Sequence, residues 1–237
     1  MIQTEGIFVG GSAISAPIIG EDFNWTGGDG TYQVLDDGGD NWRIKFLSSG
    51  TFTPLKNMVI DVFLVGGGGG AGSSYCGEGG AGYTTTVRSV VLTANTAYSI
   101  VVGAAGTNGN PSSAGGETTA FTASAAGGKN TSNGTSSSKR PGGAGGSGGA
   151  GYVSPVATTT GGTDGGDGTS SATTGGKGQG TTTREFGEAD GTLYASGGGS
   201  NLTATVSNSG NGGRNGITSI EPADGIVVIR QHKEVAA

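Results

Sequence analysis

FLVGGGGGAG, residues 63–72, joins the end of an apolar strand to five consecutive glycines. Glycine loses more conformational freedom on folding than any other residue, at a cost of roughly 0.5–1 kcal/mol relative to alanine. A chain that places five glycines after an apolar strand must therefore gain something that only a missing side chain permits. Similar glycine-rich runs recur along the sequence, so the physical reason for this junction decides the fold.

The composition is that of a glycine-rich, acidic protein. Glycine contributes 54 of the 237 residues, about three times its usual share, and the net charge is −6. Nucleic-acid binding needs dense lysine and arginine, so we expect no nucleic-acid partner. The beginning of the sequence lacks a signal-peptide pattern, and no stretch approaches the roughly 18 apolar residues of a membrane span. We therefore expect synthesis in a cytoplasm and no membrane insertion.

Several stretches have the alternation of a β-strand. In WRIKFL, residues 42–47, apolar and charged side chains alternate as in a half-buried strand. NMVIDVFLV, residues 57–65, is apolar on both faces except at Asp61, which is typical of a central strand. Further strands are expected at 32–37, 49–54, 82–92, 97–103, 117–121, 122–126 and 225–230. No window has the apolar period of a helix, so the sequence predicts an all-β fold, a jelly-roll-like β-sandwich.

An insert at about residues 127–217 is rich in glycine and poor in large apolar side chains. Such a composition is compatible with disorder. Collagen is excluded, because it needs glycine at every third position with abundant proline, and the chain has six prolines. The third interpretation is a bundle of polyglycine helices of the polyproline II type, which have three residues per turn and direct N–H and C=O groups sideways. GGAGGSGGAG, residues 142–151, has this period of three.

A bundle of such helices would pair its backbone groups laterally, which buried backbone groups require. We therefore expect FLVGGGGGAG to mark the point where a β-strand changes into a glycine helix. The other short glycine-rich runs would be neighbouring helices or the turns between them; they lie at 77–82, 103–109, 161–168, 175–180 and 197–199.

The order of these features resembles a known family. An aromatic strand is followed by SGTFT, FLVGGGGGAG, GGAGYTTTV and AYSIVVGAAG, and DGIVVIR closes the series. This order resembles the glycine-rich domain of phage and prophage tail proteins over roughly residues 40–230. GQGTTTREFGEADGTLY, residues 178–194, is similar to a block that recurs in such proteins.

The resemblance implies a virion structural protein that is not an enzyme: a tail-fibre or tail-tip adhesin, exposed on the particle, that contacts a glycan or protein of the host cell surface. Residues 1–31 would form an N-terminal arm that docks on other virion proteins, and residues 32–237 would form the glycine-rich β-sandwich domain. By analogy with fibres, the chain would form a homotrimer. The alternative is a virion decoration or head-fibre protein that binds no receptor.

Aromatic side chains outside clear strands are candidates for receptor contact, because rigid rings lose little entropy on binding. Charged residues of TTTREFGEADGTLY, residues 181–194, extend the candidate patch. The candidate contact residues are Tyr75, Tyr152, Arg184, Phe186, Glu188 and Tyr194. The alternative is that Phe186 and Tyr194 pack as a plug between glycine helices and strands, with Arg184 paired to a neighbouring glutamate.

We expect no catalytic residue, no metal and no cofactor. His232, the single histidine, is expected on the solvated surface after the last strand, which leaves none for a Ser-His-Asp triad or a metal site. Cys76 is expected to be a small loop residue. The acidic runs LDDGGDN, residues 35–41, and GGTDGGDGT, residues 161–169, match turns, with bound calcium as the alternative.

Overall fold

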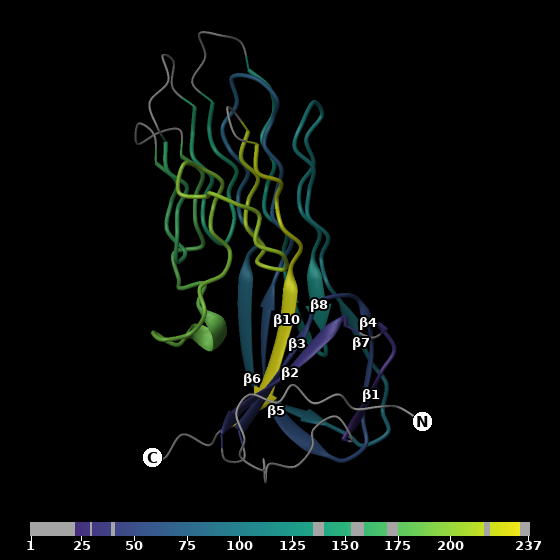
Figure 1. Ribbon diagram of the computed structural model, residues 1–237. Coiled ribbons are helices and arrows are strands. Elements are labelled where there is room, and N and C mark those ends of the chain that lie inside the picture. The colour runs from purple at the N-terminus through teal and green to yellow at the C-terminus, as the bar shows by residue number, and fades with distance from the viewer. Residues whose placement is uncertain are drawn as a thin grey trace, which may run out of the picture.

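The computed structural model describes residues 22–28, 30–38, 41–134, 140–152, 159–169, 175–215 and 219–232. It contains two antiparallel five-stranded sheets, which continue at one end into glycine-rich segments (Figure 1). The single helical element described is a 3-10 turn, η2 (Glu185–Gly187). The prediction of an all-β fold is confirmed.

The first sheet has the strand order β1-β4-β7-β8-β9 and the second the order β2-β3-β10-β5-β6. The strands of the first sheet are β1 (Phe23–Trp25), β4 (Gly50–Pro54), β7 (Tyr98–Val101), β8 (Thr118–Ala120) and β9 (Ala123–Ala125). Those of the second are β2 (Tyr32–Gly38), β3 (Asn41–Phe46), β5 (Met58–Val65), β6 (Thr84–Leu92) and β10 (Ile226–Gln231). The last strand thus returns to the middle of its sheet, where it pairs with β3 and β5.

The main hydrophobic core lies between the two sheets. Its fully buried side chains come from alternate positions of the central strands, as a sandwich requires. Members include Ile44, Phe46, Phe52, Ile60, Val62, Leu64, Ile100, Val227 and Ile229. Each such side chain contributes about 1.5–3 kcal/mol when removed from water. Strand β5 is buried on its second face too, because Phe63 and Val65 belong to a separate cluster on the outer side of the second sheet.

The glycine-rich segments form an array held by lateral backbone hydrogen bonds, called the glycine array below. Its segments are 66–72, 77–82, 103–109, 113–116, 126–131, 141–151, 159–169, 175–180, 195–199, 209–213 and 219–225. Several continue strands directly: Figure 1 shows them extending from the ends of β5, β6, β8 and β10. The array therefore prolongs the sandwich rather than forming a separate body.

The hydrogen bonds of the array repeat every three residues. The N–H groups of Gly66 and Gly69 donate to the carbonyls of Tyr83 and Gly80, at 2.9 and 2.8 Å. One residue further on, the N–H groups of Gly67 and Gly70 donate to the carbonyls of Gly116 and Ser113, at 3.0 and 2.9 Å. Between them, Gly68 donates in a third direction, to the Ala223 carbonyl at 2.9 Å. Consecutive residues of 66–70 thus donate to three different neighbouring segments.

Three more segments donate to the carbonyls of the same stretch. Gly67 accepts from Gly128 at 2.9 Å, Gly68 from Gly106 at 2.8 Å and Gly69 from Gly213 at 2.8 Å. Residues 66–70 are consequently surrounded on all sides by backbone. A Cβ atom on Gly66, Gly68 or Gly70 would overlap a carbonyl oxygen of Ala126, Asn211 or Thr107. Only a residue without a side chain fits at these positions.

The predicted N-terminal arm, residues 1–31, lies largely outside the described residues. Its described part includes β1, which pairs with β4 and places Phe23 in the core, 6% exposed. The glycine array also begins well before the predicted insert at 127–217, because it includes the segments between residues 66 and 116. Strands from both sheets enter it.

Gly68→Ala tests the close packing of the array. The added methyl group would overlap the Asn211 carbonyl, so we expect the free energy of unfolding to fall by about 1–3 kcal/mol or more. Urea denaturation of the two proteins measures this difference. Ala104→Ser is the matched control, since Ala104 lies exposed in a neighbouring array segment, and should change stability by less than about 0.5 kcal/mol. Equal effects of the two substitutions would contradict the packing described.

Candidate functional site

Residues 183–195 form a loop, called the plug loop below, that covers the outer face of the second sheet. Its ends come together through an isolated bridge between Arg184 and Leu193, and η2 lies between them. The rings of Phe186 and Tyr194 pack on Phe63 of β5, with centroids 6.0 and 5.6 Å away. They complete the outer apolar cluster with Val65 and residues of β10. The second apolar face of β5 explains why such a cover is needed.

Ion pairs join the plug loop to the sheet beneath it. Glu185, almost completely buried, accepts a hydrogen bond from Arg43 of β3 at 2.5 Å, and Lys45 lies 3.6 Å from its other oxygen. Arg43 also pairs with Asp37 at 2.7 Å. Hydrogen bonds to these two carboxylates raise the pKa of Arg43 above its already high value, although burial opposes the shift.

A second set of charges lies beside the first, around Arg230 of β10. Its guanidinium lies over the ring of Phe186, 4.1 Å from the centroid, and donates to Glu188 at 2.7 Å and to Asp61 at 3.2 Å. Cation–π contact and two carboxylates hold the side chain in one orientation. The plug loop is thus fixed to both β3 and β10.

Between the plug loop and strands β2, β3 and β10 lies a pocket of about 260 Å³, called the charge pocket below. Its charged lining comes from Asp37, Arg43, Glu185, Glu188, Asp190 and Arg230. Trp42 and Phe186, both largely buried, add to the lining. Most of the charged groups are held by the ion pairs described above, so the walls of the pocket are formed before any ligand binds.

Asp61 is the buried centre of the polar network behind this pocket. Although 1% exposed, its carboxylate accepts hydrogen bonds from Arg230, Arg88 and the backbone N–H of Ser89, and His232 Nδ1 lies 2.6 Å from Oδ1. Burial would raise the pKa of Asp61, but the bonds from His232, Ser89 and Arg230 together lower it. The expectation that His232 lies on the solvated surface is therefore wrong: its ring is partly buried against β5.

Ser89, His232 and Asp61 lie together without forming a catalytic triad. Ser89 Oγ is 3.0 Å from His232 Nε2 but also only 3.5 Å from Nδ1. A hydroxyl aligned with the Nε2 lone pair would be much farther from Nδ1, because the two nitrogens point away from each other. The hydroxyl consequently lies beside the ring rather than in line for proton transfer.

The structure separates the six candidate contact residues into two groups. Phe186 and Tyr194 are 2% and 6% exposed, which corresponds to the alternative in which they pack as a plug. Arg184 pairs with Asp164, at 3.2 Å, instead of a glutamate. Glu188 lies partly exposed at the charge pocket. Burial raises the pKa of the Tyr194 hydroxyl, which lies 3.1 Å from Lys45 Nζ.

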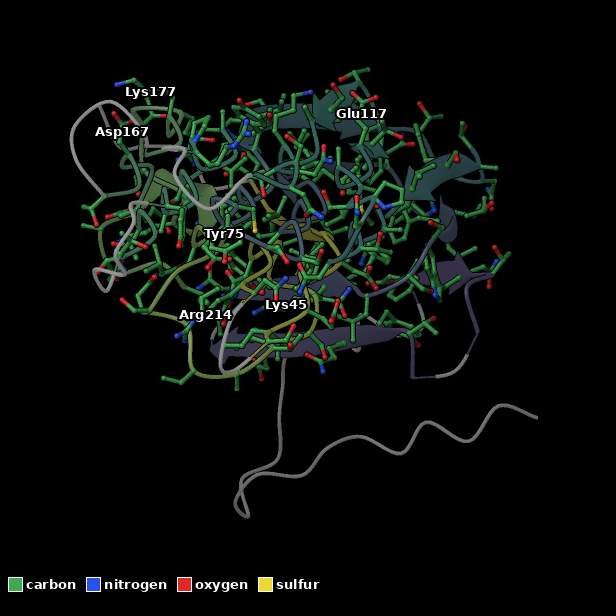
Figure 2. All side chains as sticks on the ribbon, turned by 90° about the horizontal axis from the view of Figure 1, so that it is seen from above. Lys45, Tyr75, Glu117, Asp167, Lys177 and Arg214 are labelled. Carbon is green, nitrogen blue, oxygen red and sulfur yellow. The ribbon has the colours of Figure 1, made fainter. Side chains whose placement is uncertain are left out.

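Tyr75 and Tyr152 form the second group, at the end of the array remote from the sheets. Residues 73–76 connect the array segment that continues β5 to the one that leads into β6, so Tyr75 lies in the turn between them. Tyr75 is 45% exposed and its ring makes an edge-to-face contact with Tyr152, with centroids 5.8 Å apart. In Figure 2, which looks down on the molecule from above, Tyr75 lies within the outline while Asp167 and Lys177 lie at its rim.

The acidic turns have partners within the chain. Asp164 accepts from Thr182 and Arg184, Asp167 pairs with Lys177 at 2.7 Å, and Asp36 accepts the N–H of Gly38. In the described ranges, no three His, Cys, Asp or Glu side chains are placed to hold a metal ion. Cys76 is buried, and burial raises the pKa of its thiol to about 11.

Glu78 is a titratable side chain inside the glycine array, a feature that the sequence analysis missed. It lies in the segment 77–82 and accepts the N–H of Asn215 at 2.7 Å. Burial raises its pKa to about 7, with the Asn215 N–H and the charge of Arg214 opposing the shift. Its position in a glycine-rich run, CGEGGAG, could have indicated this, because closely packed glycine segments leave little room for a solvated side chain.

Glu78→Gln tests this burial. A pKa raised by folding means that the stability given by the neutral carboxyl is complete below about pH 4.5 and is lost as the pH rises through about 7. Glutamine stays neutral and still offers an oxygen to Asn215. We expect the variant to match the wild type at about pH 4 and to exceed it by up to roughly 3 kcal/mol at about pH 8, measured by thermal unfolding. The same pH dependence in both proteins would contradict the shift.

Among the described residues, no helix has the length and apolar character needed to cross a membrane. No curated protein sequence matches the chain. The family profile described as a glycine-rich domain matches residues 47–230, which include β4 to β10, the plug loop and the described part of the glycine array.

Proposed function

The chain belongs to the glycine-rich domain family, and we propose that it is a structural protein of a phage particle, a tail-fibre or tail-tip adhesin that contacts the host cell surface. The order of motifs between residues 40 and 230, which resembles phage and prophage tail proteins, supports this proposal. So does the arrangement of the molecule, in which a tightly bonded array carries turns at a distance from the sandwich. In this proposal the protein acts by binding, and its place is the surface of the particle.

We also propose that the array segments are polyglycine helices of the polyproline II type. Lateral hydrogen bonds repeat every three residues, as in Gly66 and Gly69 toward Tyr83 and Gly80, and such a helix has three residues per turn. Neighbours on all sides exclude a Cβ at the inward positions. A bundle of this kind resists bending because every segment is bonded to several others.

The observation that carries the adhesin proposal is the pair Tyr75 and Tyr152 at the remote end of the array. Tyr75 adopts a positive φ of 46° and remains 45% exposed. Positive φ values are uncommon outside glycine and cluster at binding and catalytic sites, and Tyr75, in this conformation, carries an exposed ring. Tyrosine suits such a role, since it offers a rigid apolar face and a hydroxyl.

The opposite side of the molecule would attach to the particle. The predicted arm of residues 1–31 includes β1, which belongs to the sandwich, whereas the tyrosine pair lies beyond the array. We propose that the arm binds other virion proteins and that the chain assembles as a homotrimer. This division leaves the array free to project outward.

Binding of the purified, fluorescently labelled protein to a panel of bacterial strains tests the proposal. We expect saturable binding to a subset of strains, reduced at least tenfold by Tyr75→Ala and by Tyr152→Ala, because one substitution removes the exposed ring and the other removes the half-buried ring that packs against it. Lys177→Ala is the control: this side chain is 79% exposed on the array but lies away from the tyrosines. Circular dichroism of each variant verifies folding.

Two results would overturn the proposal in different ways. Binding that is unaffected by both tyrosine substitutions would move the contact surface elsewhere on the protein. Absence of binding to every strain that supports the phage would favour the alternative, a decoration or head-fibre protein in which the array provides only rigidity and spacing.

A further inference from the structure

The charge pocket is formed by three parts of the chain that are far apart in sequence: the β2–β3 hairpin, the plug loop and the end of β10. Arg43 fixes one wall by pairing with both Asp37 and Glu185, and Arg230 fixes the other by pairing with Glu188. Each wall has one buried member, Glu185 at 2% and the Arg230 side chain at 10% exposed, paired with a partly exposed partner. The pocket is therefore preorganised, which lowers the entropy lost on binding a ligand.

The pairing of these charges decides which ligands the pocket can take. An anion would have to displace carboxylates from Arg43 and Arg230. A cation would have to displace guanidinium groups from Glu185 and Glu188, or else pair with Asp190, whose exposed carboxylate offers only a weak, solvent-screened attraction. Both exchanges cost free energy, because breaking a partly buried ion pair leaves one charge without its partner. A neutral ligand meets no such cost.

Hydrogen-bonding capacity remains in the pocket after the ion pairs are made. Each carboxylate oxygen can accept more than one hydrogen bond, and a guanidinium carries five N–H groups. Asp190 is exposed at the rim, and Thr192 adds a hydroxyl beside it. Hydrogen bonds to charged groups are stronger than those between neutral groups, so a ligand with several adjacent hydroxyls matches this lining.

The volume of the pocket, about 260 Å³, is slightly below the roughly 300–1,000 Å³ of sites for drug-sized molecules. It corresponds to one sugar ring rather than to a longer chain. Trp42 and Phe186 also line the pocket but are only 9% and 2% exposed, so the accessible lining is mainly polar.

We propose that the charge pocket binds a neutral monosaccharide unit, with Arg43 and Arg230 donating hydrogen bonds to its hydroxyls and Glu188 and Asp190 accepting them. This site is separate from the tyrosine pair at the end of the array. It does not depend on the assignment to a phage particle, because it rests on the pocket alone.

Titration of the full-length protein with D-glucose, D-galactose and N-acetylglucosamine, followed by two-dimensional NMR, tests the proposal. We expect at least one sugar to cause saturable shifts, with a millimolar Kd typical of single sugar rings, at residues of β3, the plug loop and the end of β10. Asp190→Ala should weaken binding at least fivefold, since it removes an acceptor without disturbing an ion pair of the walls. Asp167→Ala, which removes an exposed carboxylate from the array, should leave the affinity unchanged.

Sodium phosphate and methylammonium chloride serve as charged probes in the same titration. We expect neither to cause saturable shifts at the pocket, because both would compete with existing ion pairs. Absence of saturable shifts with all three sugars would overturn the proposal. So would stronger binding of either charged probe, or an affinity that Asp190→Ala and Asp167→Ala reduce equally.

Discussion

The backbone of residues 66–70 packs directly against the backbone of the surrounding segments, with no room for side chains between them. Their N–H and C=O groups bond to six neighbouring segments, and a methyl group at Gly68 would overlap the Asn211 carbonyl. Stacked sheets lie about 10 Å apart because side chains fill the interval. Once the chain changes to glycine beyond Val65, this interval is no longer required, and strands from both sheets converge into one array. Glycine's entropic cost is thereby offset by backbone hydrogen bonds that a longer side chain would prevent.

Much of the sandwich could be predicted, because its strands carry a pattern. Alternation in 42–47 and the two apolar faces of 57–65 correspond to β3 and β5. The neighbours within the array could not be predicted in the same way. Glycine offers no side chain whose polarity records what lies beside it, so nothing in the sequence pairs Gly69 with Gly80 or Gly213. The place of β10 between β3 and β5 was not predictable either, because its apolar residues indicate a buried strand but do not specify its neighbours.

The candidate site was predictable only in part, for a related reason. The aromatic and charged residues of the plug loop could be recognised, but their burial depends on what the loop covers. The burial of Phe186 follows from Phe63 on the second face of β5, because this apolar face must be covered and Phe186 packs on it. His232 was misplaced because its partner, Asp61, lies on the same outer face but 171 residues earlier in the chain.

Strand β5 connects these features within a few residues. Asp61 holds the polar network behind the charge pocket, Phe63 holds the plug loop, and the residues after Val65 form the centre of the array. Successive residues of a strand point to opposite faces, so Ile60, Val62 and Leu64 meanwhile fill the sandwich core. The sandwich core, the charge pocket and the glycine array therefore all depend on β5 and on its register with the neighbouring strands. A shift of β5 by one residue would exchange its two faces, placing Asp61 in the sandwich core and moving the glycines relative to all of their hydrogen-bonding partners.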